Sequence, residues 1–280
     1  MENDVLKWYN AGIERNRLRV GVGRIEWERT KEILLERLPK PPAVIYDIGG
    51  GYGEYAWWLA SLGYEVHLLD LSATNIAMSE ELAEEYPGVA FRAAEVCDAC
   101  DVPRPDGSAE VVLLMGPLYS ILSRRKRIRA IREGYRLLKK GGVLFSAALT
   151  PFSVLIPRIT MYRREDTVKC RELEDPAVVE MIERALKTGE YRNPEHTIAR
   201  GLGTSHLHTA KELREELCEG GFATEGIYGV MGGAWLAPEL DVLWQDTTAR
   251  EVLMKTVRIL DGQEEILGLS GHLLAVSYKK

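Results

Sequence analysis

A glycine-rich segment between Asp47 and Gly53 has the composition of a ligand-binding loop. It reads Asp47-Ile-Gly-Gly-Gly-Tyr-Gly53 and follows a short run of apolar residues typical of a strand. Glycine has no Cβ atom, so it permits positive φ angles and lets the backbone pass close to a ligand. A helix that begins after such a loop offers unpaired N–H groups to a negatively charged group. The segment therefore predicts a binding loop, although the same composition also serves a plain tight turn.

A second acid, Asp70, ends the next predicted strand. Its two carboxylate oxygens could accept hydrogen bonds from both hydroxyl groups of a ribose at the switch point of a parallel sheet. The alternative role for Asp70 is to cap the following helix, but Ser72 or Thr74 could do that equally well. The loop and the acid together indicate a ligand of the adenosine type.

These groups must be positioned by a parallel sheet with crossover helices, because short β-rich runs alternate with helical stretches from residue 43 onward. Strands are expected at 43–48, 65–70, 89–93, 110–114, 143–149, 222–230 and 272–278. Helices are expected at 54–62, 74–85, the stretch from about 120 to 138, 176–186, 209–220 and 248–260. Asp175 and Thr209 are predicted caps of two of these helices. Two insertions, 151–205 and 231–271, interrupt the alternation.

The glycine spacing separates two classes of nucleotide-binding enzyme. A nicotinamide-dependent oxidoreductase requires Gly-x-Gly-x-x-Gly, but counting from Gly49 places Glu54 in the last glycine position. A carboxylate there would repel a pyrophosphate. Counting from Gly50 places Tyr52 and Tyr55 in the remaining glycine positions.

The alternating glycines instead resemble the first motif of class I S-adenosylmethionine-dependent methyltransferases. In that family the acid and glycines surround the methionine part of the cofactor, the next acid binds the ribose, and later residues contact the adenine. The cofactor-binding residues that this resemblance implies are Asp47, Gly49, Gly50, Gly51, Gly53, Asp70, Leu71, Asp98, Ala99 and Met115.

The segment Met115-Gly-Pro-Leu-Tyr119 resembles the Gly-Pro-Leu-Tyr signature of one bacterial subset of the family. That subset commonly has a histidine after the tyrosine, where this chain has Ser120. The role of such a histidine is therefore open in this protein.

The resemblance implies an α/β fold with a Rossmann-like sheet of seven strands, an antiparallel last strand and helices on both faces. It predicts a single methyltransferase domain over residues 1–280, with a cofactor-binding core at 43–149. Residues 1–38 would form an N-terminal helical cap, and the insertions 151–205 and 231–271 would form helical covers over the substrate.

Methyl transfer from a sulfonium ion depends chiefly on positioning and on exclusion of water, so a dedicated base is optional. The candidates for substrate positioning or base catalysis are Tyr119, His196 and His206. His206 and His208 would point to the same face of an extended segment, but two ligands without a third do not make a metal site. We therefore predict no metal.

The net charge and the composition of the chain limit the kinds of partner that we expect. The net charge of −6 disfavours a general electrostatic attraction to nucleic acid. The polar, acidic start and the lack of a long apolar run predict a cytoplasmic protein without a membrane partner. The four cysteines are read as reduced thiols. We expect a monomer or a homodimer.

The expected function is transfer of a methyl group from S-adenosylmethionine to an oxygen, nitrogen or sulfur atom of a small molecule. The alternatives are an NAD-dependent oxidoreductase and a non-catalytic protein that binds S-adenosylmethionine. The identity of the acceptor is not encoded in a form that these patterns reveal.

Overall fold

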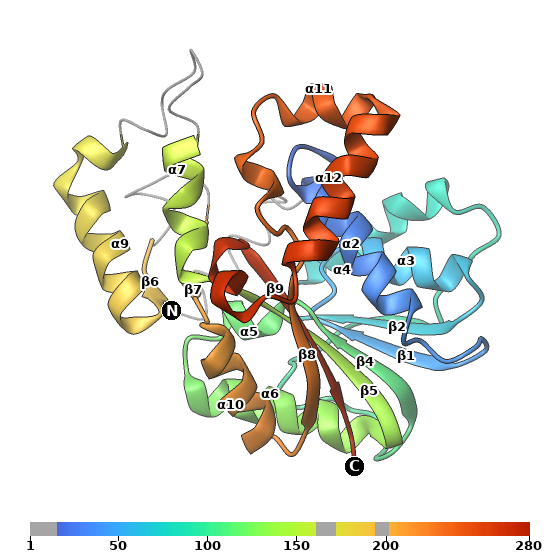
Figure 1. Cartoon of the computed structure of the whole chain (residues 1–280). Helices are drawn as coiled ribbons and strands as arrows, with labels where there is room; N and C mark the ends of the chain where they lie inside the picture. Colours follow the sequence, from blue (N-terminus) through green and yellow to red (C-terminus); the bar gives the residue numbers. More distant parts are fainter. Residues whose placement is uncertain (1–15, 161–171, 194–201) are drawn as a thin grey trace.

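The computed structural model describes residues 16–160, 172–193 and 202–280. The fold is built on a seven-stranded sheet with helices around it (Figure 1). The strand order is β3-β2-β1-β4-β5-β9-β8. The strands are β1 (Val44–Ile48), β2 (Glu65–Asp70), β3 (Ala93–Val96), β4 (Ala109–Leu114), β5 (Leu138–Leu149), β8 (Ala223–Gly229) and β9 (His272–Tyr278). A separate two-stranded ribbon pairs β6 (Glu190–Tyr191) with β7 (Ser205–His206).

The first five strands are parallel, whereas β9 lies between β5 and β8 and is antiparallel to both. This confirms the predicted Rossmann-like sheet of seven strands with an antiparallel last strand. The register pairs His272, the first residue of β9, with Leu149, the last residue of β5. Because β9 runs in the opposite direction, its beginning lies at the edge of the sheet where the parallel strands end.

Capping residues in the sequence mark where several of the helices begin. They are α2 (Gly23–Leu35), α3 (Glu54–Ser61), α4 (Ala73–Leu82), α5 (Pro117–Ser120), α6 (Arg124–Leu137), α7 (Ile156–Thr160), α9 (Pro176–Thr188), α10 (Ala210–Glu219), α11 (Leu240–Gln245) and α12 (Thr247–Leu260). The Thr209 hydroxyl accepts a hydrogen bond from the Glu212 N–H at 3.1 Å, and the Asp175 carboxylate accepts one from the Ala177 N–H at 2.9 Å. These contacts satisfy donors that the first turn of a helix otherwise leaves unpaired.

One strand lies later in the chain than the sequence pattern indicates. The expected strand 89–93 is observed as β3, at Ala93–Val96, because Val89 and Phe91 pack into an apolar cluster around Trp57 instead. The rings of Trp57 and Phe91 are 4.1 Å apart between centroids. Burial of these apolar side chains outweighs the local β-propensity of the segment.

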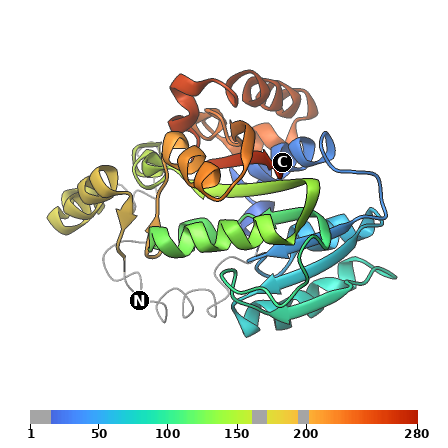
Figure 2. The same ribbon diagram turned by 90° about the horizontal axis from the view of Figure 1, so that it is seen from below.

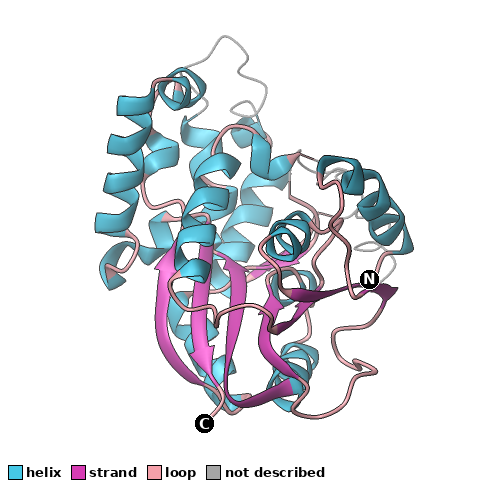
Figure 3. Cartoon of the chain, turned by 90° about the vertical axis from the view of Figure 1, so that its right-hand side faces the viewer, coloured by secondary structure: helices cyan, strands magenta, loops and turns pink. Residues whose placement is uncertain are grey.

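Helices cover both faces of the sheet (Figures 2 and 3). Side chains of α6 and α10 pack in the apolar core on one face, and side chains of α2 and α3 pack in the core on the other. Two further groups lie beyond the sheet. The helix α9 forms a separate apolar cluster with β6 and the segment after β5, and α11 and α12 pack against Ile25 of α2. Among the described helices, none has both the length and the apolar character needed to cross a bilayer.

Candidate active site

A cavity of about 680 Å³ opens at the carboxyl ends of the parallel strands. Its lining includes the segments that follow β1, β2, β3 and β4, together with the start of β9. The strand order reverses between β1 and β4, which is the point where α/β sheets bind ligands. The volume falls within the range of small-molecule sites, about 300–1,000 Å³.

The glycine loop is shaped by close contact with the segment after β4. Gly49 has φ +70°, and a Cβ atom there would lie 2.5 Å from the Pro117 ring. A Cβ atom on Gly116 would lie 2.4 Å from the Gly49 carbonyl oxygen. Gly51, at φ +61°, has no neighbouring atom within 4 Å of the position that a Cβ atom would take. The first two glycines therefore permit packing between the loops, and the third leaves backbone open at the cavity.

Asp70 holds this loop in place. Its carboxylate accepts hydrogen bonds from the Gly51 N–H at 2.8 Å, the Ser72 N–H at 2.8 Å and the Asn75 side-chain amide at 3.0 Å. The helix cap itself is Ser72, whose hydroxyl accepts from the Asn75 N–H. A carboxylate offers about four acceptor positions, so Asp70 retains capacity for a ligand hydroxyl group.

Asp47 is a buried carboxylate with an unsatisfied oxygen. Its Oδ2 atom has no hydrogen-bond partner among the described residues, although the side chain lines the cavity. Burial, together with the nearby charge of Asp70, raises the pKa of Asp47 to about 7. A cationic group bound beside Asp47 would supply the missing partner. The ammonium group of an S-adenosylmethionine fits this requirement.

The remaining residues predicted to bind the cofactor lie mostly on the cavity wall. Leu71, Asp98, Ala99 and Met115 line it, as do Gly50 and the residues already described. Leu71 is an apolar side chain that is 47% exposed, so its surface is accessible to the planar ring of a ligand. Gly53 does not line the cavity. It caps α3 at φ +86°, where a Cβ atom would press on Leu68 at 2.9 Å.

The cavity wall also carries a group of ionisable side chains from opposite ends of the chain. Arg17 donates two hydrogen bonds to the carboxylate of Glu26, at 2.6 and 2.8 Å. The Nδ1 atom of His272 lies 3.4 Å from Oε1 of the same carboxylate. All three side chains line the cavity, and both Glu26 and His272 are buried.

Burial governs the ionisation of this group. It lowers the pKa of His272 to about 4, against the opposing effect of the Glu26 charge, so the imidazole is neutral at pH 7. Burial alone would raise the pKa of Glu26, but Arg17 and His272 hold that pKa below its usual value. The result is an ionised carboxylate beside a neutral imidazole, an arrangement that can orient one ring nitrogen and leave the other to accept a proton.

The three predicted catalytic candidates differ in their position relative to the cavity. Tyr119 lines the cavity, and its ring meets that of His272 edge-on at 5.9 Å between centroids. His196 lies outside the described residues. His206 is not among the lining residues, because β7 places it against α10, where its Nε2 atom lies 2.9 Å from Glu212. His206, predicted for substrate positioning or base catalysis, therefore lies away from the wall of this cavity.

Sequence reasoning missed His272 and did not single out Glu26. A signal for His272 was available, because it is the first residue of the predicted last strand. In an antiparallel strand that position lies at the binding edge of the sheet. Glu26 shows no such signal, since its role depends on how α2 packs.

The segments predicted to cover the substrate contribute unequally to the cavity wall, as far as the structure describes them. The N-terminal part contributes Arg17, Leu18, Glu26 and Thr30 to the cavity wall. No described residue of 151–205 or 231–271 lines the cavity; residues 161–171 and 194–201 lie outside the description. Trp235 donates to the Leu269 carbonyl, and Trp244 packs in the cluster that joins α12 to α2.

Comparisons with known proteins agree with this architecture. Residues 45–142 match the family model described as a methyltransferase domain. A probable tRNA methyltransferase 9B of Bos taurus is 30% identical over 120 residues, which are 42% of this chain and 23% of that protein. The chain thus spans about a quarter of the length of the curated relatives it matches.

Two solved structures share the fold. A SAM-dependent methyltransferase from Methanosarcina mazei superposes with a TM-score of 0.57 at 22% identity, over 88% of this chain and 96% of that one. An S-adenosylmethionine-dependent methyltransferase from Mesorhizobium loti gives a TM-score of 0.56 at 20% identity, over 91% and 99% of the two chains.

Residues 45–142 therefore match a methyltransferase domain, and the described part of the chain has the fold of these two solved methyltransferases. Both solved structures are named as S-adenosylmethionine-dependent.

Proposed function

We propose that this protein transfers the methyl group of S-adenosylmethionine to a small molecule and releases S-adenosylhomocysteine. The observation that carries the proposal is that one cavity is lined by two chemically distinct groups of residues. The first group is the glycine loop with Asp47 and Asp70, and the second is His272 with Tyr119. We assign the first group to the cofactor and the second to the acceptor.

The cofactor, when bound, supplies an electrophilic methyl group on a sulfonium ion. The residues of the chain need only hold the two reactants and exclude water. Asp47 would pair with the ammonium group, Asp70 with the ribose hydroxyls, and Leu71 with the adenine ring.

His272 and Tyr119 favour an acceptor that must lose a proton. The Nδ1 atom of His272 faces the Glu26 carboxylate at 3.4 Å, which leaves Nε2 of the neutral ring available to accept a proton from a hydroxyl group. Glu26, fixed by Arg17, would orient the ring through Nδ1 and stabilise the imidazolium that forms. We therefore place an oxygen acceptor first, ahead of nitrogen or sulfur.

A tRNA acceptor is the second candidate, because the curated relatives are named probable tRNA methyltransferases. The net charge of −6 and the burial of Glu26 and His272 favour a small molecule instead. A polyanionic substrate would gain little electrostatic attraction from such a chain.

Two measurements test the proposal. Calorimetry should detect binding of S-adenosylhomocysteine, and NAD should not compete with it. The purified chain should then transfer a labelled methyl group from S-adenosylmethionine to components of a metabolite extract.

Total tRNA serves as the parallel substrate in that assay. Label recovered in tRNA alone would replace the small-molecule proposal with the second candidate. Binding of S-adenosylhomocysteine without transfer to either pool would favour a non-catalytic binding protein.

A further inference from the structure

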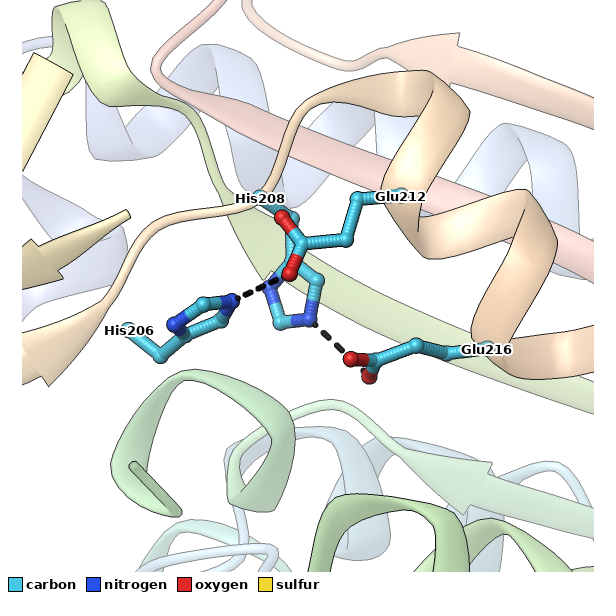
Figure 4. A group of neighbouring side chains, drawn as sticks. All are labelled: His206, His208, Glu212 and Glu216. Carbon is cyan, nitrogen blue, oxygen red and sulfur yellow. Dashed lines mark hydrogen bonds and ion pairs between the residues drawn. The ribbon is translucent and has the colours of Figure 1, made fainter. Parts of the chain in front are cut away.

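Four metal-ligating side chains converge away from the cavity, at the junction of β7 and α10. They are His206, His208, Glu212 and Glu216, and their ligand atoms lie within 4.8 Å of one another (Figure 4). None of the four lines the cavity. The sequence alone offers the two histidines, and the fold brings the two carboxylates to them.

The convergence follows from two local periodicities. Residues two apart in an extended segment point to the same face, which aligns His206 with His208. Residues four apart on a helix do the same, which aligns Glu212 with Glu216. Thr209 caps α10 directly after His208, so the chain turns and lays the helix face over the two imidazole rings.

Two of the distances are close to those of a tetrahedral site. The Nε2 atom of His206 lies 2.9 Å from Glu212 Oε1, and that of His208 lies 3.3 Å from Glu216 Oε2. Zinc bonds of about 2.0–2.1 Å in a tetrahedron separate neighbouring ligand atoms by about 3.3 Å. All four ligand atoms lie within 4.8 Å of one another, so a bound ion would draw the other pairs together.

The burial and negative charge of the four residues favour binding of a cation between them. His206, His208 and Glu216 are buried, and Glu212 is partly so. The buried guanidinium of Arg127 binds Glu216 at 2.7 Å and also lies 3.5 Å from Glu212, so one positive charge faces two carboxylates. The half-exposed Arg124 approaches Glu216 only to 3.7 Å.

We propose that His206, His208, Glu212 and Glu216 bind a divalent transition-metal ion, with Zn²⁺ the best match to two imidazoles and two carboxylates. All four positions are filled by protein, which is the pattern of a structural site and not of a catalytic one. The ion would tie β7 to α10 and α6, since Arg127 also donates to the carbonyl groups of Ile121 and Leu122 on the cavity wall.

The hydrogen bonds that other residues make to the four proposed ligands affect the affinity for the metal ion. Arg127 supports Glu216, but the Nδ1 atoms of both histidines have no hydrogen-bond partner within the described residues. Such partners typically strengthen a metal site by about 10- to 100-fold. We therefore expect binding that a strong chelator removes completely.

The test uses the full chain without an affinity tag, stripped with a chelator. It should bind one equivalent of Zn²⁺, measured by competition with a chromophoric chelator, and its melting temperature should rise with Zn²⁺. Co²⁺ in the site should give the strong visible absorption of tetrahedral coordination without a near-ultraviolet thiolate band, which separates this site from Cys97 and Cys100.

Glu212→Gln is the diagnostic variant, because Glu212 is only partly buried and its loss leaves the Arg127–Glu216 pair intact. It should weaken Zn²⁺ binding at least about 10-fold and reduce the thermal shift accordingly. His206→Asn, checked for folding by circular dichroism, should do the same. The exposed neighbour Glu215→Gln should bind like the unmodified chain.

The proposal is overturned if the stripped chain binds no Zn²⁺ or Co²⁺. It is also overturned if binding survives unchanged in both Glu212→Gln and His206→Asn, or if the cobalt spectrum shows thiolate ligation. In those cases the four residues form a hydrogen-bonded network around Arg127 alone.

Discussion

The Nδ1 atom of His272 lies 3.4 Å from the carboxylate of Glu26, although the two residues come from opposite ends of the chain. The contact joins the start of β9 to the helix α2 at the wall of the cavity. It places a neutral imidazole, held by an ionised carboxylate, on the wall of the cavity.

His272→Gln should reduce methyl transfer to an oxygen acceptor by about 10²- to 10⁴-fold, the usual contribution of a positioned base. Binding of S-adenosylhomocysteine should stay nearly unchanged, because His272 is assigned to the acceptor and not to the cofactor. Single-turnover kinetics and calorimetry measure the two effects. His67→Gln, on β2 and outside the cavity, is the matched control. Equal losses in both variants would remove His272 from the chemistry.

Tyr119→Phe should lower turnover by about 2- to 10-fold, the worth of one hydrogen bond, while the affinity for S-adenosylhomocysteine changes little. The substitution removes only the hydroxyl group and keeps the edge-on ring contact with His272. Tyr46→Phe, which removes a hydroxyl bound to Ser108 outside the cavity, controls for general effects. If turnover is unaffected, Tyr119 serves as packing.

Asp70→Asn should weaken S-adenosylhomocysteine binding by about 1–3 kcal/mol, since it removes charge-assisted acceptors for the ribose and disturbs the bond to Gly51. Isothermal calorimetry gives the difference. Asp106→Asn, on an exposed aspartate that pairs with Arg136, should bind as tightly as the unmodified chain. Unchanged affinity in Asp70→Asn would refute the assignment.

Asp47 predicts a pH dependence of stability in the ligand-free protein. Its pKa rises from 3.8 to about 7 on folding, so between these values the folded chain holds a proton that the unfolded chain has lost. The stability from this group therefore falls as pH rises, by up to about 1.4 kcal/mol per pH unit. His272, whose pKa is lowered to about 4, contributes in the opposite sense between about 4 and 6.5.

The difference between Asp47→Asn and the unmodified chain isolates the Asp47 effect. In urea denaturation the stability of the variant should rise relative to that of the unmodified chain from pH 5 to about pH 7 and level off above it. Saturating S-adenosylhomocysteine should shrink the difference, because its ammonium group favours the ionised carboxylate. A pH-independent difference would contradict both the burial of the charge and its pairing with the ligand.

Gly49→Ala should destabilise the fold more than Gly88→Ala. Both positions have positive φ, which costs a side chain about 1–2 kcal/mol. A Cβ atom added at Gly88 would enter open space, whereas one added at Gly49 would overlap the Pro117 ring. Overpacking adds about 1–3 kcal/mol. Denaturation curves of the two variants measure the difference, and equal losses would mean that the Pro117 segment moves freely.

The amino-acid sequence by itself determined the features that depend on neighbouring residues. The glycine loop, the acids Asp47 and Asp70, and the caps Asp175 and Thr209 were readable because backbone geometry and capping act over a few residues. The order and type of most strands followed from short-range patterning. The antiparallel direction of the last strand was predicted from the resemblance to class I methyltransferases. The shift of β3 marks the limit, since Phe91 was drawn away by a contact with Trp57.

The tertiary structure decided which side chains meet. Glu26 and His272 pair only because α2 packs beside the start of β9, and no local pattern contains that contact. His206 lies outside the cavity wall because β7 places it beside α10, next to Glu212 and Glu216. Pairing between distant segments depends on the packing of whole elements, and the pKa of each group depends on the burial that this packing creates.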